Sequence, residues 1–538
     1  MNKKIKKAFA LLLATLTIGA CGFSVGCGSN SRNDDQYLEI FVADFGYGTK
    51  WVDNLISLFR QQDYIKQKYP NLDISYSKNS LETFTEDTIV SRNTTIDLFF
   101  STNSCFASID QKENGKSAFE DLSDVYSAEV PGEGGITVGE KMNDNFKKNS
   151  VFQDKDGNEK MYTMPWVAGT MGLIYNKSLI EKYYGENYRL PLTTNQFSSM
   201  ADDIRKNKNN TPFMFSAEAG YWDSSMFLVW WAQYEGLDNY TNFWEGKDAF
   251  GDTSCEIFNQ KGRLKSMEVI QNLIGFKTEN GVEITNSHAL ATDLTYRQAQ
   301  TRFKNGTGVF MPNGDWFQNE ESVSDTGECV ITFMKTPVIS EIVEKLEYRK
   351  DGEYMSDELL AEVVKAVDEG KTQIDEVSAA DFDRIRNARN MAYPLGGHGA
   401  YIPEYSVSKG LAKDFLIFMS TDIACESFIR STGGSSQPFD YDVQTKNPEL
   451  FNSLSQMHKD RIEISESAIY FPNGLNYKLF YYGGVRYINR TTDVLEICFC
   501  ATNPKDRKTP SQIFSADYDY YSKNDEQNWK SVLTNMGY

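Results

Sequence analysis

Histidine and closely spaced cysteine, the residues that build most metal sites and disulfide frameworks, are scarce in this sequence. Three histidines occur in 538 residues, and His288, His398 and His458 lie far apart. Six cysteines are scattered after residue 100, with Cys498 and Cys500 as the one close pair, which we expect on one face of a strand. The pattern predicts neither a metal site nor a disulfide scaffold, and we expect no cofactor.

Basic residues and long apolar runs are also few. The chain has 55 Lys and Arg against 75 Asp and Glu, for a net charge of −20. A surface of that sign repels phosphate backbones, so we expect no nucleic-acid partner. Beyond the N-terminal segment, nothing approaches the roughly 20 apolar residues that a membrane-spanning helix needs. The sequence also lacks repeats and the G-x-S-x-G, H-E-x-x-H and Walker motifs of common enzyme families.

The N-terminus has the organisation of a secretory signal. Residues 2–7 are basic and polar, residues 8–20 are apolar, and a cysteine follows directly. A charged segment before a short apolar run is typical of a signal peptide. We therefore predict a signal peptide over residues 1–20.

This signal ends at a cysteine rather than at an Ala-x-Ala site. Ile18-Gly19-Ala20-Cys21 resembles the bacterial lipobox, in which the cysteine becomes a lipidated N-terminus, and Cys27 is the alternative. Residues 21–36 are assigned to the lipidated cysteine and a flexible, polar tether. The resemblance implies a lipid anchor at the extracellular face of the cytoplasmic membrane. An ordinary signal peptide with an incidental cysteine stays open as the other interpretation.

Polar loops follow two expected strands near the start of the mature chain. Residues 37–43 and 95–100 have strand composition, and an amphipathic helix is expected between them at about 51–59. Because ligands bind at the carboxyl ends of strands in open α/β sheets, loops 44–48 and 101–104 are candidate pocket walls. Further helices are expected at about 264–274, 296–303, 356–370 and 378–390, with a buried strand at 308–311.

The stretch from Met164 to Gly172 combines a tryptophan with small residues inside an apolar run. Small side chains let a backbone bend and let another group approach it closely. By residue types alone, the stretch fits a buried strand with Trp166 in the core as well as it fits the floor of a cleft.

Four stretches, in order, resemble the extracellular solute-binding proteins of ABC importers, in the branch related to maltodextrin-binding proteins. They are Pro165-Trp166 with Gly172-Leu-Ile-Tyr-Asn-Lys177; Phe303-Lys-Asn-Gly306 with Met311 and Gly314-Asp-Trp316; Ala412-Lys-Asp-Phe415 with Phe418-Met-Ser420; and the lipobox. The resemblance covers about residues 37–440. The sequence departs from it in a helical insertion and in a long C-terminal segment.

The resemblance implies an α/β fold of the periplasmic-binding-protein type, with two lobes, a hinge and an interlobe cleft that closes on a ligand. Residues 166–172 are then the first crossing between lobes, with Trp166 at the cleft floor. The implied division is 37–168 and 394–440 for the N-terminal lobe, 169–340 and 441–538 for the C-terminal lobe, and 341–393 for the insertion.

Several expected loops carry aromatic residues beside polar ones. An aromatic ring suits the apolar face of a sugar, and carboxylate and amide groups suit its hydroxyl rim. The candidate ligand-binding residues are Asp44, Tyr47, Asn103, Trp166, Glu218, Trp222, Asp223, Asn313, Asp315, Trp316, His398 and Tyr401. Trp230, Trp231 and Tyr234 are aromatic too, but their helical spacing favours packing inside the protein.

These features favour a binding protein that captures a solute, a sugar or oligosaccharide above all, and delivers it unaltered to an ABC permease in the membrane. We expect it to act as a monomer. A secreted glycoside-acting enzyme is the alternative class, with Glu218 and Asp315 as the carboxylate pair to test, although nothing fixes their separation. The same fold can also bind a metal, a polyamine or a peptide, or report to a membrane sensor.

Overall fold

The computed structural model describes residues 35–538 except 82, 114–115 and 322–328. Cys21, Cys27, the expected signal peptide and the tether up to residue 34 lie outside this part. No helix within the described ranges combines the length and apolar character that crossing a membrane requires.

The first of two main sheets has five strands in the order β2-β1-β3-β13-β6. They are β1 (Tyr37–Ala43), β2 (Asp73–Asn79), β3 (Leu98–Phe100), β6 (Met164–Pro165) and β13 (Gly399–Tyr401). β1 pairs in parallel with β2 and β3, and β13 runs antiparallel to β3 and β6. Strand β13 is remote in sequence, so the chain returns to this sheet after leaving it.

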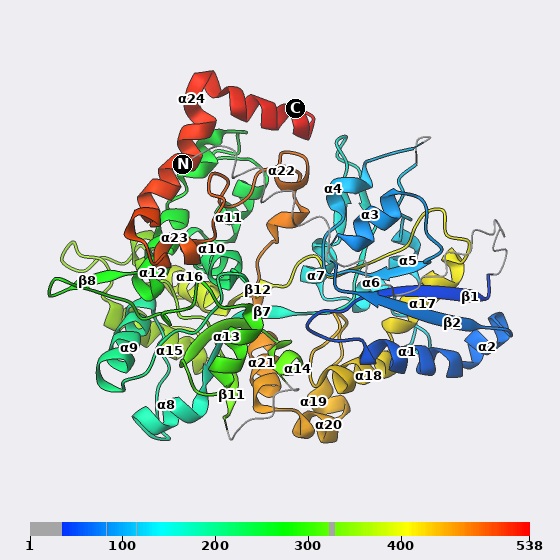
Figure 1. The fold of residues 1–538 in the computed structure, drawn as a ribbon, viewed down its shortest axis with the longest axis horizontal. Helices are drawn as coiled ribbons and strands as arrows, with labels where there is room; N and C mark the ends of the chain where they lie inside the picture. The colour runs from blue at the N-terminus through cyan, green and yellow to red at the C-terminus, as the bar shows by residue number, and fades with distance from the viewer. Residues whose placement is uncertain (1–34, 82, 114–115, 322–328) are drawn as a thin grey trace, which may run out of the picture. The chain divides into compact units, whose positions relative to one another are not determined.

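Helices cover both faces of the first sheet. They are α1 (Lys50–Gln61), α2 (Asp63–Lys68), α3 (Phe84–Val90), α4 (Phe106–Ile109), α5 (Ser123–Ser127), α6 (Val138–Lys141), α7 (Asp144–Lys148), α17 (Lys409–Met419) and α18 (Asp422–Thr432). Ile40 and Val42 of β1 pack in one core with α1, α17 and α18, while Phe41 packs on the opposite face with Phe106 of α4. The alternation along β1 therefore supplies two cores, one on each face (Figure 1).

The second sheet is built around β7 (Thr170–Asn176). Its other strands are β10 (Phe310–Gly314), β11 (Ile331–Met334), β12 (Met391–Pro394) and β14 (Ile469–Tyr470). β10, β11 and β12 pair antiparallel with β7, and β14 pairs in parallel with β12. Two small hairpins lie outside the main sheets, β4 (Val151–Gln153) with β5 (Glu159–Met161) and β8 (Lys277–Glu279) with β9 (Val282–Ile284).

The remaining helices follow β7 in the chain. They are α8 (Lys177–Tyr184), α9 (Thr194–Asn207), α10 (Phe227–Glu235), α11 (Leu237–Trp244), α12 (Lys261–Ile274), α13 (Tyr296–Lys304), α14 (Phe317–Glu321), α15 (Asp357–Asp368), α16 (Ala379–Asn390), α19 (Val443–Lys446), α20 (Pro448–Ser453), α21 (Gln456–Glu466), α22 (Lys478–Tyr481), α23 (Leu495–Cys500) and α24 (Pro510–Met536). The helices predicted from sequence at 264–274, 296–303, 356–370 and 378–390 are confirmed as α12, α13, α15 and α16.

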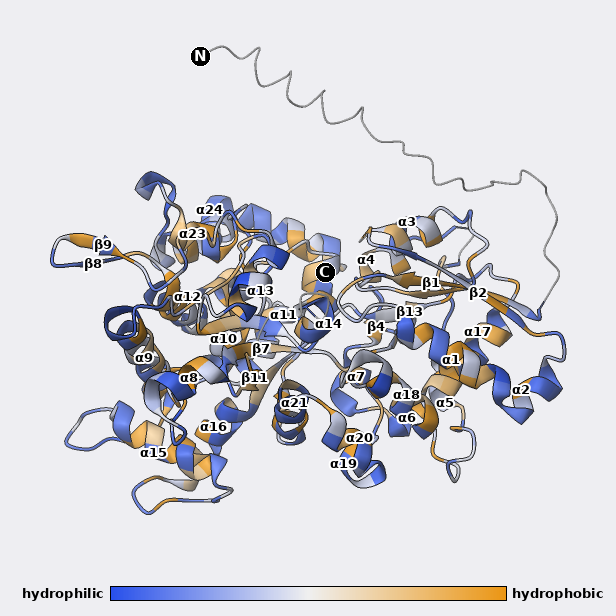
Figure 2. Cartoon of the chain, turned by 60° about the horizontal axis from the view of Figure 1, so that its bottom comes forward, coloured by the Kyte–Doolittle hydropathy of each residue, from blue (hydrophilic) through white to orange (hydrophobic). Residues whose placement is uncertain are grey.

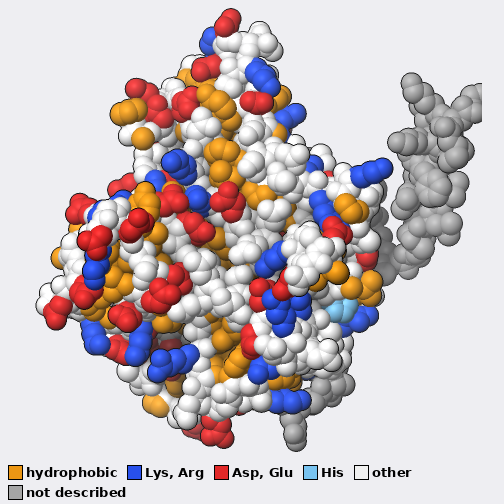
Figure 3. Space-filling view, turned by 90° about the vertical axis from the view of Figure 1, so that its left-hand side faces the viewer, with side chains coloured by type: hydrophobic (Ala, Val, Ile, Leu, Met, Phe, Trp, Pro, Cys, Tyr) orange, Lys and Arg blue, Asp and Glu red, His pale blue; other side chains and the backbone are white. Residues whose placement is uncertain are grey.

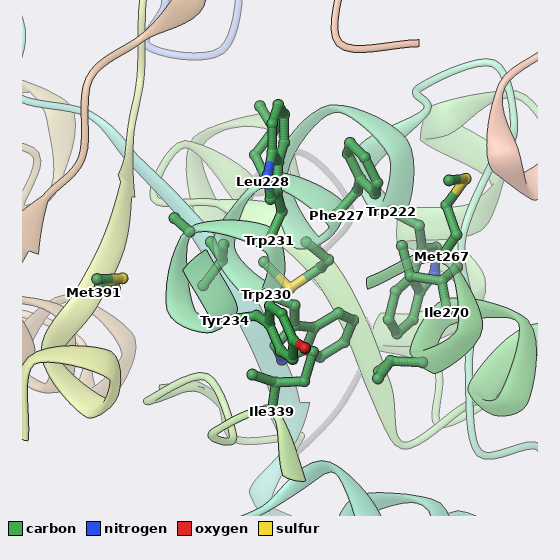
Figure 4. Close-up of a cluster of buried hydrophobic side chains, with 14 of the residues drawn as sticks. Trp222, Phe227, Leu228, Trp230, Trp231, Tyr234, Met267, Ile270, Ile339 and Met391 are labelled. Carbon is green, nitrogen blue, oxygen red and sulfur yellow. The ribbon is translucent and has the colours of Figure 1, made fainter. Parts of the chain in front are cut away.

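Aromatic side chains of α10 fill the core beside the second sheet. Trp230, Trp231 and Tyr234 are buried and pack with Met267 and Ile270 of α12 (Figure 4). The prediction that these three residues serve packing is confirmed. The separation of buried apolar residues from exposed polar ones extends over the chain. In Figure 2, orange residues gather on the strands and blue ones cover outward helix faces.

The segment 341–393 packs into this same core. Ser356 caps α15 by accepting the Leu359 N–H, and the apolar faces of α15 and α16 join the cluster that holds Trp230. The last residues of the segment form β12, which pairs with β7 at Tyr393 and Met171. Acidic and basic side chains are interspersed over the side of the molecule that lies to the left in Figure 1 (Figure 3).

The expectation that Cys498 and Cys500 lie on a strand is wrong. Both belong to the short helix α23, whose first turn closes when the N–H of Cys498 donates to Val494 O at 3.0 Å. A short apolar run has no periodicity that separates a strand from a buried helix, which explains the error. All six described cysteines are free thiols, and Cys498 and Cys500 are buried.

Candidate functional site

Two segments that connect the sheets lie side by side. Residues 166–169 lead from β6 to β7, and residues 395–398 lead from β12 to β13. The Trp166 N–H donates to His398 O at 3.3 Å, and the Leu395 N–H donates to Gly169 O at 3.0 Å. We call these residues the crossing segments, since a movement of one sheet relative to the other must bend them.

An aromatic cluster surrounds the crossing segments. The Tyr47 ring lies edge-on to Trp166, Trp316 and His398, with centroid distances of 5.7, 6.1 and 5.9 Å. Trp166 stacks on Trp51 at 5.0 Å, and its Nε1–H donates to Ser101 O at 2.8 Å. Residues from the loop after β1, from both crossing segments and from the end of β10 thus meet at one point.

Asp315 and Trp316 reach this point because of the glycine before them. A Cβ on Gly314 would lie 2.0 to 2.3 Å from the Trp316 ring, so only glycine leaves room for the ring to fold back over the backbone. Tyr221 adds a further ring, 6.1 Å from Trp316. The sequence prediction chose its neighbour Trp222 instead.

Asp315 links this cluster to α21. Its Oδ1 accepts the Tyr47 hydroxyl at 2.8 Å, and its backbone oxygen contacts His458 Nε2 at 3.2 Å. Burial raises the pKa of the Asp315 carboxyl, and the Arg461 guanidinium partly opposes that rise. Burial likewise lowers the pKa of His398 to about 4, so this imidazole is neutral at physiological pH.

Trp222 and Asp223 face the core beside the second sheet instead of the aromatic cluster. The Trp222 ring contacts Phe213 at 5.3 Å and Trp230 at 6.2 Å, and Figure 4 shows it inside this packed group. Asp223 is buried and accepts the Tyr487 hydroxyl at 3.0 Å. Both face inward because residues 222–226 form a π-helical turn at the start of α10.

The other candidates also have defined places. Glu218 accepts the N–H of Tyr296 at 2.9 Å at the start of α13, Asp44 pairs with Lys78 at 2.8 Å, and Asn313 is buried within β10. Tyr401 lies in β13, and its hydroxyl accepts the Cys105 N–H at 3.1 Å. Asn103 lies in the loop after β3, next to Gly397. Of the twelve candidates, the structure brings together Tyr47, Trp166, Asp315, Trp316 and His398.

A cavity of about 390 Å³ opens between elements associated with the two sheets. One side is formed by α7, β4 and β5, where Phe152 of β4 packs in the core with Phe41 and Phe99 of the first sheet. The opposite side is formed by the end of α11 and by C-terminal residues. The lining residues used below are Asn145, Asn149, Glu159, Trp244, Tyr470, Asn476, Tyr477 and Tyr481.

A second, narrow cavity of about 30 Å³ shares Asn149 and Asn476 with the large one. It is lined further along by Leu395, His398 and Tyr401. The large cavity therefore lies next to a smaller one at the crossing segments, and its size falls within the roughly 300–1,000 Å³ of small-molecule sites.

None of the twelve residues predicted from the sequence lines the large cavity. Asn145 lies in the first turn of the short helix α7 and Asn149 caps its C-terminus, while Tyr470, Tyr477 and Tyr481 lie in a tyrosine-rich stretch. The i, i+4 spacing of two amides was a usable signal, because such residues share a helix face. Nothing in the sequence indicated that the C-terminal stretch faces this helix.

The crossing segments provide a prediction about Gly169. A Cβ there would lie 2.4 Å from the Tyr47 hydroxyl and 2.5 Å from Leu395 Cδ2, so Gly169→Ala must displace the Tyr47–Asp315 hydrogen bond. We expect a loss of about 1–3 kcal/mol in the free energy of unfolding, the usual cost of overpacking, measured by urea denaturation. Gly172→Ala is the matched control, since its Cβ would meet only Phe333 at 3.7 Å. Equal losses in the two variants would contradict the argument.

The arrangement defines a class of protein: two α/β groups joined by adjacent crossing segments, with a ligand-sized cavity between them. Solved structures share this fold. A chitin oligosaccharide binding protein matches with a TM-score of 0.55 at 14% identity, over 92% of this chain and 99% of that one. An ABC substrate-binding protein from Listeria monocytogenes, in complex with cycloalternan, matches with a TM-score of 0.55 at 14% identity, over 94% and 100%.

The family follows from the sequence itself. The model for bacterial extracellular solute-binding proteins matches residues 76–452, and the chain belongs to that family. A multiple sugar-binding protein of Streptococcus mutans is 23% identical over 172 residues, which are 32% of this chain and 37% of the relative. The match thus spans little more than a third of that relative's length.

Proposed function

We propose that this protein captures a sugar or short oligosaccharide in the large cavity and delivers it, unaltered, to an ABC permease. The observation that carries the proposal is the composition of the cavity wall. Half-buried rings of Tyr470 and Tyr477 lie opposite the amides of Asn145 and Asn149, and Glu159 adds a carboxylate. Rings suit the C–H faces of a sugar, and amides and carboxylates suit its hydroxyl groups.

The sugar-binding names of the relatives support this ligand class. The family membership supports an extracellular role with a membrane permease as partner, which we extend to a lipid anchor at Cys21 or Cys27 and to a monomeric state. Capture would follow from the crossing segments: a ligand that contacts both sides of the cavity favours the arrangement in which the two sides are close.

The position of the candidate carboxylates supports binding rather than hydrolysis. Glu218 caps α13, and Asp315 is fully buried and bonded to Tyr47, so each already has a structural partner. Neither residue lines the large cavity. We therefore propose no catalytic role for this pair.

A thermal-shift screen against mono- and oligosaccharides, polyamines and peptides tests the proposal. A ligand at 100 times its Kd should stabilise the protein by about 2.7 kcal/mol, which raises the unfolding temperature measurably. Calorimetry on each hit gives the Kd, and chromatography of the recovered sugar shows whether it is intact. Stabilisation by a polyamine or peptide alone, or turnover of the sugar, would refute the proposal.

A further inference from the structure

Residues 470–481 lie beyond the part of the chain that matches the family, and they form one side of the large cavity. We define Tyr470, Asn476, Tyr477 and Tyr481 as the C-terminal wall. This wall is supplied by a segment outside the family match, so the family match itself does not describe any ligand contact that it makes.

Several polar side chains that line the cavity have no protein partner among the described residues. In the described part of the chain, the hydroxyls of Tyr470 and Tyr477 and the side-chain amide of Asn476 form no hydrogen bond. The same holds for the amides of Asn145 and Asn149 on the other side of the cavity. All five side chains are half-exposed, so their polar groups are available to hydrogen-bond with a ligand in the cavity.

The wall is also held rigidly. The Tyr481 hydroxyl donates to Gln153 O at 2.7 Å, and its ring stacks on Phe152 at 5.7 Å. Tyr470 contacts Phe146 at 5.5 Å, and Trp244 lies against Gly474, where a Cβ would be 2.3 Å from the indole. A fixed wall loses little freedom when a ligand binds, which favours selective recognition.

We infer that the C-terminal wall determines which sugar this protein selects, with Tyr477 and Asn476 contacting the ligand opposite Asn145 and Asn149. The inference rests on the proposed function and names the residues that give its site its selectivity. The wall would hold one face of a neutral sugar ring against Tyr477, while the amides on both sides would form hydrogen bonds with its hydroxyl groups. Burial raises the pKa of Tyr477 to about 12, so its hydroxyl stays a neutral donor at physiological pH.

Calorimetry on the full mature chain with the sugar panel tests the inference. We expect Tyr477→Ala and Asn476→Ala to weaken the best sugar by about tenfold or more, and to narrow the ratio of Kd values between that sugar and the next best. Tyr477→Phe, which keeps the ring, separates loss of the hydroxyl from loss of the ring. Tyr520→Ala, from the same C-terminal region but outside both cavities, is the matched control and should leave the Kd unchanged.

The outcomes separate the two proposals. If wild-type protein binds a sugar but the wall variants bind it with the same Kd and the same ratio, the inference is overturned while the proposed function stands. If the wild type binds no sugar in the panel, both fall. A lower unfolding free energy with an unchanged Kd would identify the wall as purely structural and would also overturn the inference.

Discussion

Asp517→Asn should lower the free energy of unfolding by about 3–5 kcal/mol, the largest effect of a single substitution that the structure predicts. Asp517 and Arg263 form an ion pair in which both side chains have no exposed surface. The change keeps the size of the side chain and its Oδ1, which accepts the N–H groups of Asn489 at 3.2 Å and Arg490 at 2.8 Å. It removes the negative charge and places an NH2 donor where Oδ2 accepts from Arg263.

The cost arises from the cation that is left behind. Arg263 lies among the rings of Trp231, Phe243, Phe258 and Phe514, at 5.3 to 5.9 Å, and it also donates to Phe258 O and Tyr487 O. Burial lowers the pKa of its guanidinium, and Asp517 opposes that effect. Without the carboxylate, a charged group stays in an apolar site with no counter-charge, which folding disfavours strongly.

An exposed pair on the same helix provides the control. Asp519 bonds Lys523 at 2.9 Å, with side-chain exposures of 55% and 64%, so Asp519→Asn should change stability by at most about 1 kcal/mol. Both variants are compared with wild type by urea denaturation at 25 °C. A cost for Asp517→Asn no larger than that for Asp519→Asn would contradict the role of burial.

Local patterns in the sequence predicted several of the helices and strands but not this kind of contact. The helices α12, α13, α15 and α16 follow from apolar spacing, caps and C-terminal glycine, all of which act within a few residues. Arg263 and Asp517 are 254 residues apart, and no local rule pairs them. The fold class came from ordered motifs of a family, and long-range pairing came only from the structure.

The candidate site shows the same division between local and long-range information. Tyr47, Asp315, Trp316 and His398 were chosen as aromatic or polar residues of expected loops, and Trp166 was chosen from the family resemblance. Trp222 was chosen because carboxylates flank it in an expected loop, but a π-helical turn directs it into the core while Tyr221 faces Trp316. A shift of one position along a helix turns a side chain to another face, and composition alone does not determine which position faces the core.

The C-terminal wall could not be predicted from the sequence for a different reason. Its position depends on β14 pairing with β12 at Ala392 and Tyr470, which fixes the stretch that follows beside α7 and β4.

Glu496 of α23 caps the π-helical turn before α10, and its burial leads to a second prediction. Its Oε1 accepts the Trp222 N–H at 2.7 Å and the Asp223 N–H at 3.4 Å.

Glu496 should make the protein less stable as the pH rises from neutral. Its side chain has no exposed surface, and burial together with the Asp223 carboxylate raises its pKa to about 8. In the unfolded chain a glutamate loses its proton near pH 4.3. Between these values the native state holds a proton that the unfolded state lacks, so the free energy of unfolding falls by up to about 1.4 kcal/mol per pH unit.

Other buried groups fix the window in which this effect is visible. Burial lowers the pKa values of His398 and His458 to about 4, so these residues make stability rise with pH until their unfolded forms lose protons near pH 6.5. Burial also raises the pKa of Asp223 to about 6, and this carboxyl adds to the downward slope below that value. The opposing contributions overlap below about pH 6.5. From about pH 6.5 to 8, the contribution of Glu496 to the pH dependence of the unfolding free energy remains.

Glu496→Gln should remove this slope, because glutamine keeps an oxygen acceptor for the two N–H groups but has no proton to lose. We expect the difference in unfolding free energy, the Glu496→Gln variant minus wild type, to grow steadily between about pH 5 and 8 and to level off above. Urea denaturation at half-unit pH steps measures it, and Glu463→Gln on the exposed face of α21 is the control that should follow wild type. A difference that is constant with pH would mean that Glu496 is already ionised in the folded protein, and that the carboxyl pair is stabilised by contacts other than a retained proton.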